Sequence, residues 1–463
     1  MQTEHSHSLG RPGVLGDEPS RSSRGLQLTT ERIALLLSGA LWAAVAYGQT
    51  PAPGVSSTEP SPGTAAPAPP AQPTTTGLIR GNPATPQPVP DLAVNMALPA
   101  QRGFIREEPV FIYPSLAGGL GYNDNLTGVH DNRISSAVVT LFPRVRADVK
   151  RGSDVYALTY NGRYGHYFSS SENDVNEHEI VATSNNQFTA RADLAATAFY
   201  LIRQDQGGSV DRSFTGTPDR WHGAGAFATF GYGGASAQGR LEFDAGATDK
   251  RYQNNRDVTQ SFDVATWDVG ARFLYRIAPK TRLLAELRHT DYDYRSSPLD
   301  SDEQRYLLGA TWDVTAATSG TVKLGYVTKN FKQEGLDDHA GFTGEAAVRW
   351  MPRTYSTVEI VALYAPSDST GTGVFTIDTS VGARWDHYWK SYLLTRVAAS
   401  YVNSDFKGTS RTDNVSRIGI GSYFDIRTWL RLGVEFSHEN RNSTDATADF
   451  SRNIVLLTIG GTL

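Results

Sequence analysis

Apolar and polar residues alternate along the chain from about residue 111 to its end. In 429–437 (WLRLGVEFS), large apolar side chains occupy every second position. The same alternation fills 240–248 (RLEFDAGAT), 320–329 and 374–386. A period of two residues sends successive side chains to opposite faces of a β-strand. These segments therefore predict strands with one apolar and one polar face.

The connections between these segments alternate in length. Short ones, such as Lys150–Gly152 and Pro352–Arg353, are followed by longer polar loops, such as 205–220 and 441–449. Eight short and nine long connections would join eighteen strands. Tight periplasmic turns and longer external loops are typical of bacterial outer-membrane barrels. The expected fold class is therefore all-β: a transmembrane, antiparallel up-and-down β-barrel of about 18 strands over 111–463.

Two segments of different composition precede the predicted barrel. Residues 1–48 end in a 14-residue apolar run, Ile33–Ala46, which is too short to span a bilayer but suits a signal peptide cleaved after Ala46 or Gly48. A buried helix of a soluble domain is the alternative interpretation of this run. Residues 49–110 are rich in Pro, Ala and Thr, and such a segment buries too little apolar surface to fold. We expect 49–110 to be a disordered periplasmic lead.

Bulk composition narrows the class of protein. Hydrophobic residues make up 39% of the chain and its mean hydropathy is −0.37, which excludes a helical membrane protein but not a barrel. The chain has no cysteine, so it has no disulfide and no thiolate metal site. A formal charge of −5 argues against nucleic acid as a partner. No catalytic motif and no metal-ligand spacing is found, so we expect no enzyme activity, metal or cofactor.

The two faces of the predicted strands have different roles. An 18-stranded barrel is too wide for side chains to fill, so the apolar face is expected to contact lipid and the charged face to line the lumen. Rings of charge in a lumen set ion selectivity, and with both signs present we expect a weakly selective pore. The alternative is that these charges pair across neighbouring strands and stiffen the wall. The pore-lining candidates are Arg144, Arg146, Arg240, Glu242, Asp244, Arg272, Arg282, Glu286, Arg288, Lys323, Glu345, Arg349, Arg384, Arg396 and Arg431.

The first predicted strand ends in Tyr122-Asn123-Asp124-Asn125. A strand with this ending, followed by many hairpins, resembles the putative β-barrel porin 2 family over about 105–463. The resemblance implies a porin-like barrel of the Gram-negative outer membrane, in a family whose members often accompany capsule or exopolysaccharide biosynthesis. The expected function is a water-filled pore, with exopolysaccharide export as one use of it. The alternative is a structural or assembly barrel without transport, whose Pro-rich lead docks a periplasmic partner.

The same resemblance implies the partners. They are outer-membrane lipids and lipopolysaccharide, the barrel-assembly machinery and periplasmic components of polysaccharide export.

Overall fold

The computed structural model describes residues 105–107, 109–212, 214, 216–234, 236–313 and 317–462. The predicted signal peptide and most of the predicted lead lie outside these residues. The first ten strands are β1 (Ile105–Glu107), β2 (Val110–Asn123), β3 (Ser136–Arg151), β4 (Asp154–Tyr167), β5 (Val175–Thr189), β6 (Ala192–Asp205), β7 (Asp219–Tyr232), β8 (Gly239–Tyr252), β9 (Val264–Ala278) and β10 (Thr281–Tyr294). The others are β11 (Ser301–Asp313), β12 (Thr318–Phe331), β13 (His339–Arg353), β14 (Ser356–Asp368), β15 (Phe375–Lys390), β16 (Leu393–Lys407), β17 (Thr412–Arg427), β18 (Leu430–Ser443) and β19 (Phe450–Thr462).

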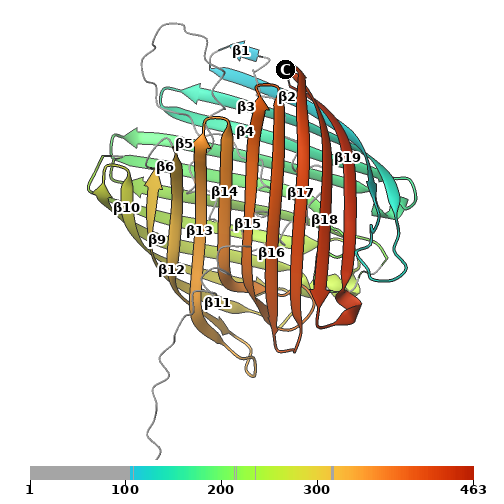
Figure 1. Ribbon diagram of the computed structural model, residues 1–463. Helices are drawn as coiled ribbons and strands as arrows, with labels where there is room; N and C mark the ends of the chain where they lie inside the picture. The colour runs from blue at the N-terminus through green and yellow to red at the C-terminus, as the bar shows by residue number, and fades with distance from the viewer. Residues whose placement is uncertain are drawn as a thin grey trace, which may run out of the picture. The chain divides into compact units, whose positions relative to one another are not determined.

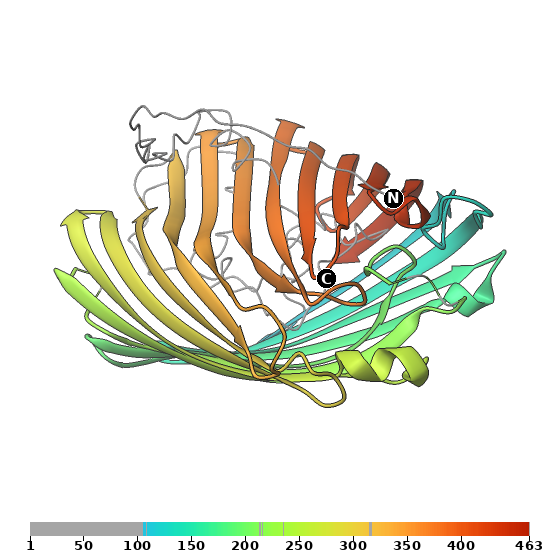
Figure 2. The ribbon, with the colours of Figure 1, turned by 90° about the horizontal axis from the view of Figure 1, so that it is seen from below.

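Strands β2 to β19 form one closed antiparallel barrel (Figures 1 and 2). Each strand pairs with the next along the chain, and β19 pairs with β2 to close the ring. The barrel therefore has 18 strands, which confirms the predicted fold class and strand number. The nineteenth strand, β1, pairs only with β2 and lies outside the ring.

The helical elements are short and lie in the loops. They are α2 (Arg256–Thr259) and the 3-10 turns η2 (Ser171–Asn173), η3 (Gln260–Phe262) and η4 (Ala446–Ala448). Among the described residues, no helix is long and apolar enough to cross a membrane.

The two ends of the barrel differ in the length of their connections. At the end where β2 begins and β19 ends, neighbouring strands are joined by short turns; we call this the short-turn end, at the top and left of Figure 1. The opposite end carries the longer connections, including 206–218 between β6 and β7, and we call it the long-loop end. By the rule for bacterial barrels, the short-turn end faces the periplasm.

Several boundaries differ from those expected from the sequence. Residues 105–107, inside the predicted disordered lead, form β1, because their backbone pairs with residues 110–112 of β2. The turn expected at Pro352–Arg353 lies two residues later, and Pro352 remains in β13 at a break in the pairing between Trp350 and Arg353. Proline has no N–H to donate, so a strand can keep it only at an edge or at such an irregularity.

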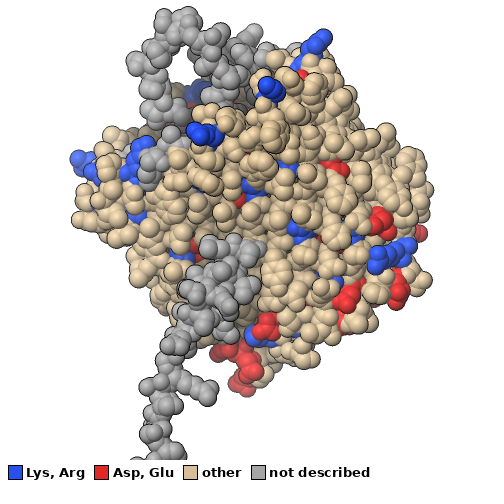
Figure 3. Space-filling view, viewed as in Figure 1, with Lys and Arg blue, Asp and Glu red and all other residues tan. Residues whose placement is uncertain are grey.

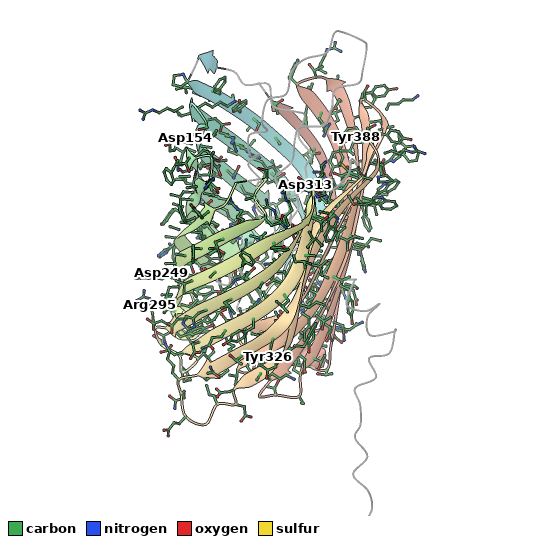
Figure 4. All side chains as sticks on the ribbon, turned by 90° about the vertical axis from the view of Figure 1, so that its left-hand side faces the viewer. Asp154, Asp249, Arg295, Asp313, Tyr326 and Tyr388 are labelled. Atoms are coloured by element: carbon green, nitrogen blue, oxygen red, sulfur yellow. The ribbon has the colours of Figure 1, made fainter. Side chains whose placement is uncertain are left out.

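The outer face of the barrel is apolar. Large side chains on alternate positions are exposed there, among them Leu308 (68%), Leu120 (62%) and Ile277 (55%). Figure 3 shows an outer surface that is mostly uncharged, with acidic side chains gathered toward one edge. Near the long-loop end, the side chains of Asp249 and Arg295, both labelled in Figure 4, lie 2.7 Å apart. An apolar belt bordered by charge is the surface that a bilayer requires.

Apolar side chains also lie inside the barrel, which the alternation did not predict. One buried cluster joins Leu201, Trp221 and Tyr252, and another joins Val264, Tyr292 and Tyr294. All of them occupy inward positions in the half of the barrel near the long loops. The inner face is therefore not uniformly polar, because large aromatic side chains reach far enough from the wall to pack with one another.

Candidate functional site

The pore-lining candidates all stand on the inner face of the wall. On β10, for example, Arg282, Glu286 and Arg288 alternate with the exposed Leu283 and Leu287. The same alternation holds for the candidates on the other strands, since each has the parity opposite to the exposed apolar residues of its strand. The sequence pattern thus placed these side chains on the inward face.

A continuous set of ion pairs follows the inner wall from β8 to β13. Arg272 of β9 bonds Glu242 of β8 at 2.5 Å and Glu286 of β10 at 2.9 Å. Lys323 of β12 lies 2.9 Å from Glu286 and 3.2 Å from Glu345 of β13. These side chains are nearly all buried, so each charge is compensated mainly by its partners rather than by water.

Pairing extends to most of the candidates. At least thirteen of the fifteen form an ion pair with an oppositely charged side chain: Arg146, Arg240, Glu242, Asp244, Arg272, Glu286, Arg288, Lys323, Glu345, Arg349, Arg384, Arg396 and Arg431. A paired charge contributes less to the field in the lumen than an unpaired one. The pairing therefore supports the alternative in which these charges stiffen the wall by pairing across neighbouring strands.

The loop between β6 and β7 crosses the mouth at the long-loop end. Going one way around the ring from β7, the strands β8 to β13 come before β14. Going the other way from β6, the strands β5, β4, β3, β2, β19, β18, β17 and β16 come before β15. The β14–β15 loop therefore starts almost opposite the β6–β7 loop. Even so, the Asp211 carboxylate accepts a hydrogen bond from the Thr370 backbone N–H at 2.6 Å, and Arg212 donates to the Thr370 carbonyl at 2.8 Å. The loop can make these bonds only by reaching across the mouth.

Three arginines, one each on β18, β19 and the β16–β17 loop, hold this loop by its backbone. Arg411 donates to the Asp211 carbonyl at 2.8 Å, and Arg452 donates to the Gly207 carbonyl at 3.0 Å. Arg441 donates to the Gly208 carbonyl at 2.8 Å and to the Val210 carbonyl at 3.3 Å. A guanidinium has five donors in a fixed fork, so one side chain can hold two carbonyls of a loop. Residues 207–211 are therefore tied down at successive positions.

The glycines of this loop allow its closest approach to the wall. A side chain on Gly207 would collide with the backbone of Thr127, and one on Gly208 would meet the Phe450 ring. Gly208 also has a φ of +76°, which side-chain-bearing residues rarely adopt. The pair Gly207–Gly208 thus lets the loop lie directly against β19 and the β2–β3 loop.

Arg212 connects the loop to its own hairpin. Its guanidinium bonds the carboxylates of Asp219 at 2.8 Å and Asp205 at 3.2 Å, and it lies 5.1 Å from the centres of the Tyr252 and Phe262 rings. Burial acts to lower the pKa of Arg212, but the neighbouring Tyr252, Asp205 and Asp219 raise it above its ordinary value. The guanidinium therefore stays charged, and it holds both ends of the loop together at any ordinary pH.

Arg411, Arg441, Arg452 and Arg212 were not singled out from the sequence. Arg441 and Arg452 belong to strands, where they read as ordinary inner-face charges, and Arg411 and Arg212 belong to polar loops. The length of 205–220 and its adjacent glycines were the available signal, since a long Gly-containing loop is the element most able to fold inward.

The motif Tyr122–Asn125 lies where β2 meets β19. Tyr122 is exposed on the outer face, whereas Asn123 and Asn125 are buried. Asn125 donates from Nδ2 to the carbonyls of Val129 and Ser451, and its backbone N–H donates to the Asn123 side chain. The motif therefore orders the β2–β3 loop and fastens it to the last strand. Within the described part of the chain, no group of His, Cys, Asp or Glu side chains is arranged to hold a metal ion.

Comparison with known proteins gives a family and several structural neighbours. The family model described as Putative beta-barrel porin 2 matches residues 110–461. The outer membrane protein OpdK of Pseudomonas aeruginosa is 13% identical, with a TM-score of 0.45 and 76% of this chain and 99% of that chain covered. OccK2 (OpdF) of Pseudomonas aeruginosa is 11% identical, with a TM-score of 0.44 and coverages of 78% and 99%.

A third similar structure is the FrpB iron transporter of Neisseria meningitidis, 9% identical with a TM-score of 0.42, covering 74% of this chain and 65% of that one. No curated protein matches the chain. The family match spans nearly the whole described barrel, from the first residue of β2 to the penultimate residue of β19. The chain therefore belongs to the putative β-barrel porin 2 family and is a porin-like barrel of the outer membrane.

Proposed function

We propose that the barrel forms a water-filled, weakly selective pore whose outer mouth is narrowed by the β6–β7 loop. The observation that carries this proposal is the closed ring of 18 strands, β2 to β19, since barrels of about 16–18 strands leave an aqueous channel between their walls. A charged wall is stable only beside water or opposite charge, and a closed ring of this size leaves space for water between its walls.

Weak selectivity follows from the balance of the two signs. The paired residues of the β8–β13 wall include both arginines and carboxylates at similar depth, so neither sign dominates that part of the lumen. The mouth is different, because its anchors are arginines. The three anchoring arginines share the two carboxylates of Asp413 and Glu439, which compensates part of their charge.

Export of a polysaccharide, which the family resemblance implies, would require the β6–β7 loop to move. An extended polymer cannot pass a mouth that a loop bridges from one wall to the other. The proposed export role therefore includes displacement of residues 206–212 from the anchoring arginines, whereas diffusion of small solutes does not.

Single-channel recording in planar bilayers tests the pore. Purified protein should give discrete conductance steps, with a reversal potential in a salt gradient close to that of a nonselective pore. Flotation with liposomes reports insertion independently. Insertion without conductance would overturn the proposal and favour a structural or assembly barrel.

A further inference from the structure

A cavity opens from the inner wall near the short-turn end. It has a volume of about 330 Å³ and lies against strands β8 to β12 and the β9–β10 turn. Among its lining residues are the cations Arg272, Lys280, Arg282 and Lys323 and the anions Glu242 and Asp313. Asp313 stands at the end of β11 that faces the short turns (Figure 4). The lining thus carries two more positive charges than negative ones.

The lining carboxylate of Glu242 already forms ion pairs with neighbouring arginines. Glu242 bonds Arg240 at 2.8 Å and Arg272 at 2.5 Å. Arg272 and Lys323 share further carboxylates of the wall, so their charges are largely compensated. The lining cations nearest the turn are Lys280 and Arg282, and the carboxylate of Asp313 lines the same end of the cavity.

An arginine pair stands directly across the sheet at this position. Arg282 of β10 is the register partner of Arg276 of β9, and both side chains point inward. Elsewhere on these two strands the matched inward pair is Glu286 and Arg272, which are opposite in charge. Like charges directly opposite each other destabilise a sheet. Arg282 also lies within electrostatic reach of Arg240, whose own charge is paired with Asp193 and Glu242.

Two of these cations have no ion-pair partner in the described chain. Neither Arg276 nor Lys280 is bonded to a carboxylate of any described residue, in contrast to the cations deeper in the wall. Lys280 and Arg282 line the cavity, and Arg276 stands opposite Arg282 across the sheet. A cavity that can hold several non-hydrogen atoms and is bordered by such cations is suited to an oxyanion. Guanidinium groups bind carboxylate and phosphate oxygens in matching geometry, and a lysine adds a point charge.

We propose that this cavity, which Lys280 and Arg282 line and beside which Arg276 stands opposite Arg282 across the sheet, binds a carboxylate or phosphate group of a solute at the periplasmic mouth of the barrel. This proposal rests on the proposed pore only in one respect, which is the route by which a bound solute would cross the barrel. Binding from the short-turn end needs no conductance, since the cavity lies on the inner wall beside the β9–β10 turn.

Isothermal titration calorimetry on the full chain in detergent tests the site. Inorganic phosphate and succinate are the probes, and glycerol is the uncharged reference. We expect saturable binding of at least one anion and none of glycerol, and the anion that binds identifies the group. The double variant Arg276→Gln/Lys280→Gln should weaken binding about tenfold or more, because two charge-assisted contacts are lost.

The matched control is Arg151→Gln/Arg353→Gln, which removes two cations from other short-turn strand ends and should bind as the wild type does. The inference is overturned if the wild type binds neither anion, or if Arg276→Gln/Lys280→Gln binds as tightly as the wild type. A protein that binds phosphate but conducts no current would overturn the proposed pore and leave this site in place.

Discussion

The carboxylate of Asp124 accepts two hydrogen bonds from Asn453, one from its backbone N–H at 2.6 Å and one from its side-chain amide at 2.7 Å. The two residues are 329 positions apart in the chain and meet where the end of β2 lies beside the start of β19. The ladder between these strands covers Ile454–Thr462, and the backbone N–H of Asp124 extends it by a hydrogen bond to the Asn453 carbonyl at 3.1 Å. The barrel is therefore closed by side chains as well as by the sheet.

Asp124→Ala should weaken this seam. The substitution leaves two donors of Asn453 without their acceptor, which costs about 1–3 kcal/mol of unfolding free energy. Thermal unfolding of the purified protein in detergent, followed by circular dichroism, measures the loss. Asp131→Ala is the control, since Asp131 lies in the same loop with its side chain 87% exposed. Equal unfolding temperatures for the two variants would contradict a role for Asp124 in closure.

Release of the β6–β7 loop should widen the outer mouth. Arg441→Ala/Arg452→Ala removes the donors to three loop carbonyls, each a charged hydrogen bond of about 1.5–3 kcal/mol. We expect larger single-channel conductance and more frequent fluctuation of the open level. Arg220→Ala, at an exposed position at the start of β7, should leave the conductance unchanged.

The arginine double variant also removes partners of Glu439 and Asp413, so a second variant addresses the loop alone. Gly207→Leu places a side chain against the Thr127 backbone and should displace the loop while leaving the wall intact. If both variants conduct as the wild type does, the loop does not limit the current.

Two arginines of the same strand should respond differently to charge reversal. Arg282→Glu changes a cavity-lining charge and should shift the reversal potential toward cation selectivity, whereas Arg282→Lys should not. Arg288→Glu instead places a carboxylate beside Glu286 and Glu345 and should cost about 3–5 kcal/mol of stability, because it breaks buried pairs. Bilayer recording and thermal unfolding separate these effects. A stable Arg288→Glu protein with altered selectivity would show that Arg288 faces the conduction path.

The apolar outer face predicts a dependence on depth in the bilayer. Leu308→Arg, near the middle of β11, should cost about 2–4 kcal/mol of unfolding free energy, since the charge faces the hydrocarbon core. Ile277→Arg, next to the end of β9, should cost only about 0–1 kcal/mol, because the side chain reaches the interface. Urea unfolding in lipid vesicles provides the comparison. Equal losses of unfolding free energy at the two positions would contradict this placement of Leu308 in the hydrocarbon core and Ile277 at the interface.

Much of the barrel could be predicted because the information is local. A strand repeats every two residues, so the alternation in 240–248 or 429–437 assigns each side chain to a face without knowledge of the partner strand. The alternation of short and long connections then gives the strand number and the direction of the ends. Arg272, Glu286 and Lys323 could thus be assigned to the inner wall from the sequence, and the structure places them there.

The sequence pattern did not predict which charged side chains of the inner wall face one another. The alternation of apolar and polar residues predicts that Arg276 and Arg282 point inward. Whether they face each other depends on the register of β9 with β10, including the bulge between Thr281 and Arg282. The turn at Pro352 shows the same limit, because the end of β13 depends on an irregularity in its pairing with β14.

The sequence by itself determined the strands, their number and the face on which each charge lies, since all three follow from periodicity and loop length within short stretches of chain. Only the tertiary structure decided that the β6–β7 loop bridges the mouth and that the family motif fastens the seam. Those features depend on contacts such as Arg452 with Gly207, 245 residues apart, and Asp124 with Asn453. A loop has no periodicity, and bonds from side chains to its backbone carbonyls leave no local pattern from which its path could be predicted.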